Sequence, residues 1–330
     1  MATATSYNVS GVRESLTDLL TLVEPEETPV TSRLNKVAGP GQPYHEWQAD
    51  SLSVPSFSGV LEGADVAAFE NKSANRVRFG NYIQKFRKTW RVSDILEASD
   101  VAGSKSEVAL AKARCVQEIK RDIESAICSD QDRQADNGTL PFKLRALGDW
   151  IDSSGPSDVD STVRTPSASI DATAGASLAE TTINGVLQSM FEQSGGKKDY
   201  FVPCGPTFKS LISGFQRATG SSGTTKTYQV TQDASAHRID LSVDVYNSDF
   251  GMITLVPTVF NGRTDGGSLG TTQRMRAYVI DPELVGISTM IPLGAKELAD
   301  EGGGRRGYVD TVLTLVCKNP KGLGKFAATS

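Results

Sequence analysis

Apolar residues recur at helical spacing in several parts of the chain, and each such stripe predicts an amphipathic helix. Near the N-terminus the stripe covers Val12–Val23 and ends before Pro25. A longer stripe follows the capping-box pair Ser104 and Glu107 and continues to about Asp130. At about 1.5 Å of rise per residue, this second helix is a rod of roughly 40 Å, longer than the average globular helix.

Two shorter amphipathic helices are predicted on either side of a short apolar strand. A capping box at Ser177 and Glu180 opens the first helix, and Gly195 ends it. Pro206 begins the second helix. The strand, Tyr200–Val202, lies between them. Helix, strand and helix in this order predict an α/β layer.

Alternation of apolar and polar residues predicts the strands. Two stretches, Tyr44–Leu52 and Val77–Val92, flank a segment rich in Ser, Gly, Ala and Asn and predict a long β-hairpin with a flexible tip. An isolated hairpin is marginal in water, and its unpaired edges favour pairing with another chain. Further strands are predicted at Ile239–Tyr246, Met252–Phe260, Arg276–Ile280 and Val309–Cys317.

The residues before the hairpin predict an arm rather than a domain. From Thr28 to Pro43 the composition turns to Pro, Gly and polar residues, so residues 1–43 must pack on something else. Our hypothesis is that the arm and the hairpin find their partners only on adjoining identical molecules.

Composition excludes several classes of protein. The chain of 330 residues is 38% hydrophobic and contains 31 Gly, which indicates a loop-rich shape. A net charge of -5 argues against a protein that coats nucleic acid. Four separated cysteines without a CxxC pair and two histidines do not fit a zinc site and indicate buried, reduced thiols. No secretory segment is evident after Met1, so we expect synthesis in the cytoplasm.

Candidate catalytic motifs are incomplete. Asp249-Phe250-Gly251 matches the metal-binding tripeptide of kinases, but the other kinase motifs are missing. Gly302–Gly307 lacks the GK[ST] of a phosphate loop, and Asp158 has no closing acid for a calcium loop. Composition alone leaves paired-carboxylate catalysis open, because 39 acidic residues are present, but no sequence feature supports it. We therefore predict no enzyme activity, no catalytic residue, no cofactor and no metal ligand.

A run of cations on the second hairpin strand contains no acid. Three uses stay open: a solvated face, contacts between subunits, and a nucleic-acid stripe with interleaved aromatic residues. The hairpin tip carries acids, so complementary charges occur on one polypeptide. Our candidate subunit-interface residues are Glu62, Asp65, Glu70, Arg76, Arg78, Lys85, Arg87 and Lys88.

Several fragments, in this order and spacing, resemble one family. They are Thr28-Pro29-Val30-Thr31-Ser32, His45-Glu46-Trp47-Gln48, Gly80-Asn81-Tyr82-Ile83-Gln84, Val92-Ser93, Glu118-Ile119-Lys120-Arg121-Asp122-Ile123-Glu124, Asp244-Val245-Tyr246-Asn247-Ser248-Asp249-Phe250-Gly251, Val256-Pro257, Leu298-Ala299 and Lys318-Asn319-Pro320. The chain resembles the major capsid proteins of tailed phages with the Hong Kong 97-type fold, in particular a branch found in short-tailed phages. One departure is Gly205-Pro206, where we expect a more basic helix start.

The resemblance implies an α+β fold with a defined order of parts. The implied parts are an N-terminal arm (1–43), an extended β-hairpin loop (44–92), a peripheral domain with a spine helix (93–150), an axial domain (151–275) and strands that return to the peripheral domain (276–330).

The same resemblance implies a structural role. Copies of the subunit are expected to assemble into pentamers and hexamers of an icosahedral shell, which encloses double-stranded DNA without reading its sequence. A separate scaffolding protein and a portal are the implied partners, and no membrane is involved. The expected location is the virion capsid, after synthesis in the cytoplasm of a bacterial host.

Three other classes of protein stay open. They are a cytosolic enzyme with an α/β domain, a DNA-binding protein that uses the cationic strand, and a decoration or tail protein of the same particle. An enzyme is expected to remain a small oligomer with a polar pocket. Closed shells, tubes or capsomer-sized rings in electron micrographs would favour the capsid protein.

Overall fold

The structure is a computed structural model, and it describes residues 27–327 apart from 67, 74, 100, 102–103, 155–157, 174–177, 195, 215–242 and 263–269. The helix predicted at Val12–Val23, the capping residue Ser177 and the start of the strand predicted at Ile239 lie outside the described residues. The helices are α1 (Pro29–Arg33), α2 (Asp94–Ala98), α3 (Glu107–Ile127), α4 (Leu147–Trp150), α5 (Glu180–Ser194), α6 (Pro206–Gly214) and α7 (Thr271–Met275), with 3₁₀ turns η1 (Ser167–Ser169) and η4 (Pro320–Gly322).

Within the described residues, the strands form a two-stranded ribbon, a four-stranded sheet and a six-stranded sheet. Their orders are β2-β3, β1-β10-β11-β4 and β5-β12-β9-β6-β8-β7. The strand bounds are β1 (Asn35–Val37), β2 (Tyr44–Ala49), β3 (Val77–Tyr82), β4 (Gln84–Val92), β5 (Ile170–Asp171), β6 (Lys198–Cys204), β7 (Val245–Asn247), β8 (Gly251–Pro257), β9 (Ala277–Val279), β10 (Val285–Leu298), β11 (Arg305–Cys317) and β12 (Gly324–Phe326).

Contacts between residues divide the chain into two units, and each is described by itself. The larger unit holds residues 27–86, 120–293 and 311–330. The described residues of the smaller unit fall within 87–119 and 294–310. α3, β4, β10 and β11 contribute residues to both units.

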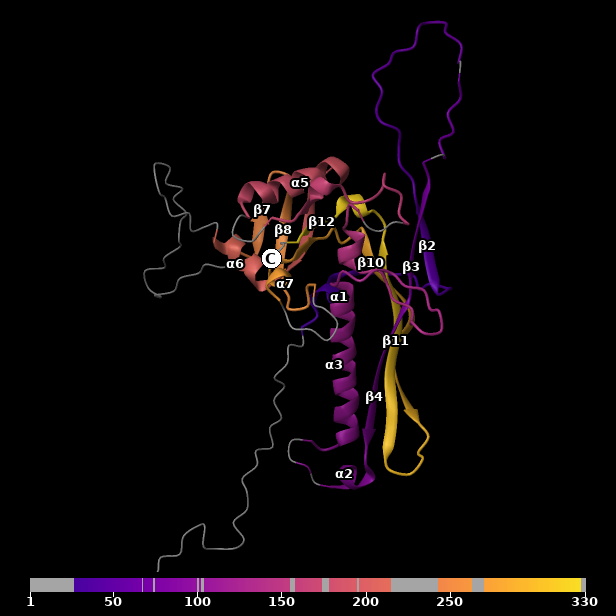
Figure 1. The fold of residues 1–330 in the computed structure, drawn as a ribbon, viewed down its shortest axis with the longest axis vertical. Helices are drawn as coiled ribbons and strands as arrows, with labels where there is room; N and C mark the ends of the chain where they lie inside the picture. Colours follow the sequence, from indigo (N-terminus) through magenta and orange to yellow (C-terminus); the bar gives the residue numbers. More distant parts are fainter. Residues whose placement is uncertain are drawn as a thin grey trace, which may run out of the picture. The chain divides into compact units, whose positions relative to one another are not determined.

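The six-stranded sheet forms the core of the larger unit, with α5 and α6 beside it (Figure 1). β6 lies between β8 and β9, and five of its seven residues are buried, which explains its continuous apolar sequence. A Cβ at Gly324 of β12 would approach Met190 Sδ of α5 to 2.8 Å, so glycine permits this close packing. The α/β layer predicted from Ser177 onward is thus confirmed within the described residues.

The smaller unit packs the first part of α3 against residues of β4 and β11. Trp90, Val108, Cys115 and Val309 are buried there. The ammonium of Lys112 lies 5.2 Å from the Trp90 ring centroid. The amphipathic stripe predicted for this long helix is therefore confirmed.

The predicted cap of α3 was displaced by two residues. The helix begins at Glu107, and Ser106 Oγ, rather than Ser104, accepts a hydrogen bond from the N–H of Ala109 (3.3 Å). The Glu97 carboxylate of α2 accepts from Val108 N–H (3.1 Å) and Ser106 Oγ–H (2.7 Å). Two acceptors therefore satisfy the free N–H groups of the first turn.

The predicted hairpin is shorter than expected. β2 and β3 pair antiparallel from Tyr44↔Tyr82 to Ala49↔Val77. After Ile83 the chain continues as β4, which pairs with β11 in the four-stranded sheet. The expectation that the second hairpin strand runs to Val92 is corrected, because the last nine residues belong to a different sheet.

The described part of the arm packs on its own chain, which corrects the hypothesis that the arm finds partners only on other molecules. The Glu124 carboxylate accepts hydrogen bonds from Val30 N–H and Thr31 N–H, both at 2.8 Å, and from Thr31 Oγ–H at 2.8 Å. Burial raises the pKa of Glu124 although these hydrogen bonds oppose the shift. β1 then pairs parallel with β10, beginning at Asn35↔Gly286.

The cysteines are free and buried, as the sequence predicted: they are Cys115, Cys128, Cys204 and Cys317. Burial raises the pKa of Cys204 and of Cys317 to about 12. These thiols therefore act as small apolar side chains at neutral pH.

Candidate functional site

The chain between β2 and β3 extends as an open loop beyond the ribbon (Figure 1). We call residues 50–76 the ribbon loop. Its described residues contain turns but no helix or strand. Within the described part of the chain, its hydrogen bonds join residues of the same loop, such as Ser73 N–H to Asn71 Oδ1 and Ala64 N–H to Leu61 O. Among the residues described, no hydrogen bond joins the loop to the rest of the larger unit.

Large apolar side chains of the ribbon loop face solvent. Phe57 is 102% exposed, Leu52 99% and Phe69 92%. Burial of one such side chain is worth about 1.5–3 kcal/mol, so the set leaves on the order of 10 kcal/mol unrealised in a free chain. So many large apolar side chains exposed in one segment favour contact with another surface. The exposed residues are Leu52, Val54, Phe57, Val60, Leu61, Val66 and Phe69.

Aromatic packing fixes the base of the ribbon. Trp47 Nε1–H donates a hydrogen bond to Cys317 O at 2.8 Å. The Trp47 ring centroid lies 5.7 Å from that of Trp150 and 6.3 Å from that of Phe79. Phe79 and Trp150 meet edge to face at 6.3 Å. Aromatic pairs of this geometry add about 0.5–1.5 kcal/mol each beyond the burial of their area.

Asn81 joins β3 to two neighbouring segments through its side chain. It is fully buried, and its Nδ2 donates to Leu315 O (2.8 Å) and Arg145 O (3.2 Å). Its Oδ1 accepts from Arg145 N–H at 2.7 Å. Nearby, Thr314 Oγ–H donates to Tyr82 O at 2.9 Å. The ribbon is therefore tied to β11 of its own chain by side-chain hydrogen bonds. For the base of the hairpin, this corrects the hypothesis that the hairpin finds its partners only on other molecules.

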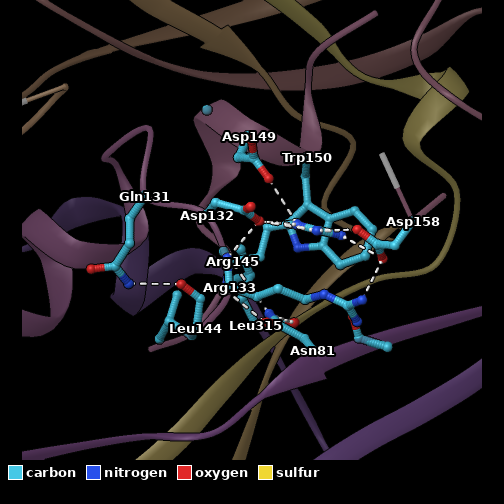
Figure 2. A network of polar contacts seen from close by, with 12 residues as sticks. Asn81, Gln131, Asp132, Arg133, Leu144, Arg145, Asp149, Trp150, Asp158 and Leu315 are labelled. Atoms are coloured by element: carbon cyan, nitrogen blue, oxygen red, sulfur yellow. Dashed lines mark hydrogen bonds and ion pairs between the residues drawn. The ribbon is translucent and has the colours of Figure 1, made fainter. Parts of the chain in front are cut away.

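The buried guanidinium of Arg145 lies at the centre of a cluster of charged side chains (Figure 2). Its Nη2 lies 3.0 Å from Asp132 Oδ1, its Nε 2.8 Å from Asp149 Oδ2, and its Nη1 3.3 Å from Asp158 Oδ2. Burial alone would lower the pKa of Arg145, but the surrounding carboxylates outweigh it and the pKa is raised. The cation is thus held by three acids and also lies 4.9 Å from the Trp150 ring centroid.

The acids predicted as interface residues all lie in the ribbon loop. Glu62, Asp65 and Glu70 are exposed. Glu70 pairs with Lys72, whose hydrogen bond and charge lower the pKa of Glu70. Exposed pairs of this type contribute little to stability.

Two of the predicted cations lie at the base of the loop and pair with acids of β2 or its end. Arg76 Nη2 lies 3.4 Å from Asp50 Oδ2, and Arg78 Nη1 lies 3.8 Å from Glu46 Oε2. All four side chains are more than two-fifths exposed. These pairs stabilise the ribbon weakly and remain accessible to another molecule.

The other predicted cations lie on β4. Arg87 Nη2 lies 3.4 Å from Asp310 Oδ2, and its guanidinium carbon lies 4.7 Å from the Tyr308 ring centroid. Lys85 and Lys88 are on the same strand. Arg87 pairs with Asp310 of its own unit, and the meeting of the loop acids with the β4 cations across a subunit contact stays a prediction.

The incomplete catalytic motifs have structural roles. Asp249-Phe250-Gly251 belongs to the turn between β7 and β8, where Ser248 N–H donates to Gly251 O at 2.9 Å. Gly302, Gly303 and Gly304 have positive φ and form the turn between β10 and β11. No group of acids, histidines and cysteines that could hold a metal ion occurs among the residues described. Across the same ranges, every helix is too short or too polar to cross a membrane.

Sequence reasoning missed the apolar side chains of the ribbon loop and the Arg145 cluster. The exposed apolar residues of the loop could have been found from the sequence, because Leu52, Phe57 and Phe69 occur in a segment without helical or strand periodicity. The Arg145 cluster could not, because Asn81, Arg145 and Asp158 are far apart in the sequence and meet only in the fold.

Comparisons with solved structures identify the fold. The capsid of cyanophage A-1(L) is similar with a TM-score of 0.66 and 12% identity, covering 98% of each chain. A native GTA particle capsid gives a TM-score of 0.63 and 9% identity over 98% of each chain. The structure from Mycobacterium phage Bobi gives 0.63 and 11% over 100% of each chain. Identities this low show the fold alone, which is the predicted α+β capsid fold of Hong Kong 97 type.

Sequence comparisons identify the family. The major capsid protein of Escherichia phage Phieco32 is 31% identical over 129 residues, which cover 39% of this chain. The chain spans only 36% of that relative's length. The family model described as SU10 major capsid protein matches residues 2–330. A match over nearly the whole chain places the protein in the SU10 major capsid protein family, whose members build capsids and are not enzymes.

Proposed function

We propose that copies of this chain form a closed icosahedral shell of pentamers and hexamers, with the ribbon loop of each subunit laid over a neighbouring copy. The observation that carries the proposal is the exposure of the apolar side chains between β2 and β3. A second copy is the occupant that closed symmetry supplies, since one loop per subunit then finds one receiving surface per subunit. Many modest contacts of this kind add up to a stable shell.

The proposed contents of the shell are double-stranded DNA, held without sequence-specific contacts. The net charge of -5 supports containment rather than tight binding. Arg76, Arg78 and Arg87 each pair with an acid of the same chain, which reduces the charge available to phosphate. A separate scaffolding protein and a portal are the proposed partners, and we propose synthesis in the cytoplasm of the bacterial host.

The test compares apolar and charged side chains of the same loop. In the first variant Phe57, Leu61 and Phe69 are changed to Ser. In the second, Glu62→Gln, Asp65→Asn and Glu70→Gln remove the predicted acidic contacts. We expect the first variant to fold as the wild type does but to give no closed shells in negative-stain images, because the apolar burial that drives closure is lost. Deletion of residues 58–72 is expected to give the same result.

The controls separate assembly from folding. Leu140 is 50% exposed and lies outside the ribbon loop, so Leu140→Ser is expected to leave shells unchanged. Circular dichroism and the urea midpoint report whether each variant is folded. Normal shells from both the apolar triple variant and the deletion would disprove the role of the loop. Loss of shells only in the charge variant would show that the acids of the loop, rather than its apolar side chains, make the contact between subunits.

A further inference from the structure

The chain contains three asparagines that are followed directly by glycine. In such a pair the main-chain nitrogen of the glycine can approach the side-chain amide carbon of the asparagine, because glycine has no side chain in the way. Burial, secondary structure and neighbouring polar groups decide whether this nitrogen can attack the amide. The three pairs are Asn137-Gly138, Asn184-Gly185 and Asn261-Gly262.

The first pair, Asn137-Gly138, lies in an exposed loop that is closed at its base. Gln134 and Lys143 form an antiparallel bridge there, with a hydrogen bond of 3.0 Å in each direction. Residues 135–141 between them are exposed. Gly138 has a φ of +81°, and a Cβ at this position would meet nothing within 4 Å. The turn is therefore fixed at its base and open to water at its tip.

The main-chain nitrogen of Gly138 is paired with a carboxylate. Gly138 N–H donates a hydrogen bond to Asp136 Oδ1 at 2.8 Å. A general base must lie within hydrogen-bond reach of the proton that it removes, and Asp136 meets this condition. Its carboxylate is thus placed to accept the proton when the nitrogen attacks, as a base next to its nucleophile.

Two main-chain N–H groups donate to the oxygen of the Asn137 amide. The distance to Asn137 Oδ1 is 3.0 Å from Thr139 N and 2.7 Å from Leu140 N. Attack on the Cγ atom of Asn137 places a negative charge on this oxygen, and N–H donors aimed at it stabilise that charge. A base and two oxyanion donors therefore surround one amide group, and all of them come from the same turn.

The other two pairs lack this combination. Gly185 lies inside α5, where the main-chain N–H groups bond to carbonyls of the helix itself. Asn261 is fully buried, and Gly262 N–H donates to Cys128 O at 2.7 Å. A carbonyl oxygen is a much weaker base than a carboxylate, and burial keeps away the water that the reaction needs. We therefore expect the fold to protect both of these pairs.

We propose that Asn137 is a site of self-modification, where the folded chain converts asparagine into aspartate or isoaspartate without an enzyme. The Gly138 nitrogen forms a bond to Cγ of Asn137 while Asp136 takes its proton. The bond from Cγ to Nδ2 then breaks, and ammonia leaves with the proton that Asp136 held. Water opens the resulting succinimide ring at either carbonyl. One water molecule enters and one ammonia molecule leaves, so no oxidant, reductant or cofactor is needed.

The reaction changes both the charge and the backbone of the turn. Each converted chain gains one negative charge next to Asp136. Isoaspartate also lengthens the main chain by one carbon atom between the residues on either side. The charge of a subunit then depends on its age as well as on its sequence. This modification goes beyond the proposed function and does not depend on it.

The first test compares the folded subunit with the chain unfolded in guanidinium chloride, both kept near neutral pH. Mass spectrometry of the three Asn–Gly peptides measures the replacement of ammonia by water. We expect Asn137 to convert about tenfold faster in the folded subunit, a factor below the roughly 10²–10⁴ of enzyme bases because the site is open to water. Asn184 and Asn261 should convert more slowly when folded. Equal or slower conversion of Asn137 in the folded subunit would overturn the proposal, because the fold would then protect this pair too.

The second test examines the base. Asp136→Ala removes the carboxylate, so we expect conversion of Asn137 to become about tenfold slower. Asp136→Asn keeps a hydrogen-bond acceptor but not a base, and it should be equally slow; fragment spectra distinguish the two neighbouring asparagines. An unchanged or faster rate in either variant would show that the carboxylate does not act as the base.

The control removes the same kind of contact elsewhere. Asp160 is exposed and accepts a hydrogen bond from Thr162 N–H, two residues on, at 2.8 Å. Asp160→Ala should therefore convert Asn137 at the wild-type rate, and a slower rate would count against a local role of Asp136. Circular dichroism checks that each variant is folded. Because all measurements use the free subunit, their failure leaves the shell proposal standing.

Discussion

Replacement of Asn81 by Ala tests how the ribbon is attached to the larger unit. The substitution removes the partner of three main-chain groups, Leu315 O, Arg145 O and Arg145 N–H, at a fully buried position. Each unsatisfied buried group costs about 1–3 kcal/mol. Water that enters the vacated space offsets part of this cost. We therefore expect the free energy of unfolding to fall by about 3 kcal/mol, from a typical total of roughly 5–15 kcal/mol.

The assay is urea unfolding of the subunit, followed by circular dichroism. With an m value of about 3 kcal/mol/M, a loss of about 3 kcal/mol lowers the midpoint by about 1 M. Asn247→Ala is the matched control, because Asn247 is a strand asparagine with an exposed side chain, and its midpoint should change by less than about 0.2 M. A midpoint of Asn81→Ala equal to that of the control would show that the side-chain amide does not hold the ribbon.

Two further substitutions test the arm and the turn of the smaller unit. Glu124→Ala removes the acceptor of three hydrogen bonds from α1, so we expect the free energy of unfolding to fall by about 2–3 kcal/mol. Limited digestion should then cut the chain faster near Thr31. Unchanged digestion would contradict the docking of the arm. Gly304→Ala places a Cβ 2.1 Å from Val92 O at a φ of +111°. Its melting temperature should therefore fall by more than that of Gly302→Ala, whose Cβ meets nothing within 4 Å. Equal shifts in the two variants would contradict the steric argument.

Elements with strong local periodicity were predictable from the sequence. The stripe along α3 and the alternation in β11 are set by burial on one or both faces, and burial leaves its mark in the residue pattern. β10 escaped prediction, because Pro292, Gly294 and the charged residues near its end hide a strand that depends on pairing with β11. Pairing with a neighbouring strand, rather than the strand propensity of its own residues, makes such a segment a strand.

The candidate site was predictable only in part. The lone run of cations drew attention to the second hairpin strand, but charge alone could not show that Arg87 packs on Tyr308 and Asp310 of its own chain. The apolar residues of the ribbon loop were present in the sequence, yet their exposure became evident only when the fold offered them no cover. The cap at Ser106 was missed because its second acceptor, Glu97, comes from a preceding helix.

The attachment of the ribbon has a consequence for how related chains diverge. A main-chain ladder tolerates almost any change of side chain, whereas the tethers at Trp47, Asn81 and Thr314 each depend on a side chain that can donate a hydrogen bond. Evolution can alter these tethers one at a time while both sheets keep their strand pairing. The attachment of the ribbon can therefore change from one related chain to another while the fold stays the same.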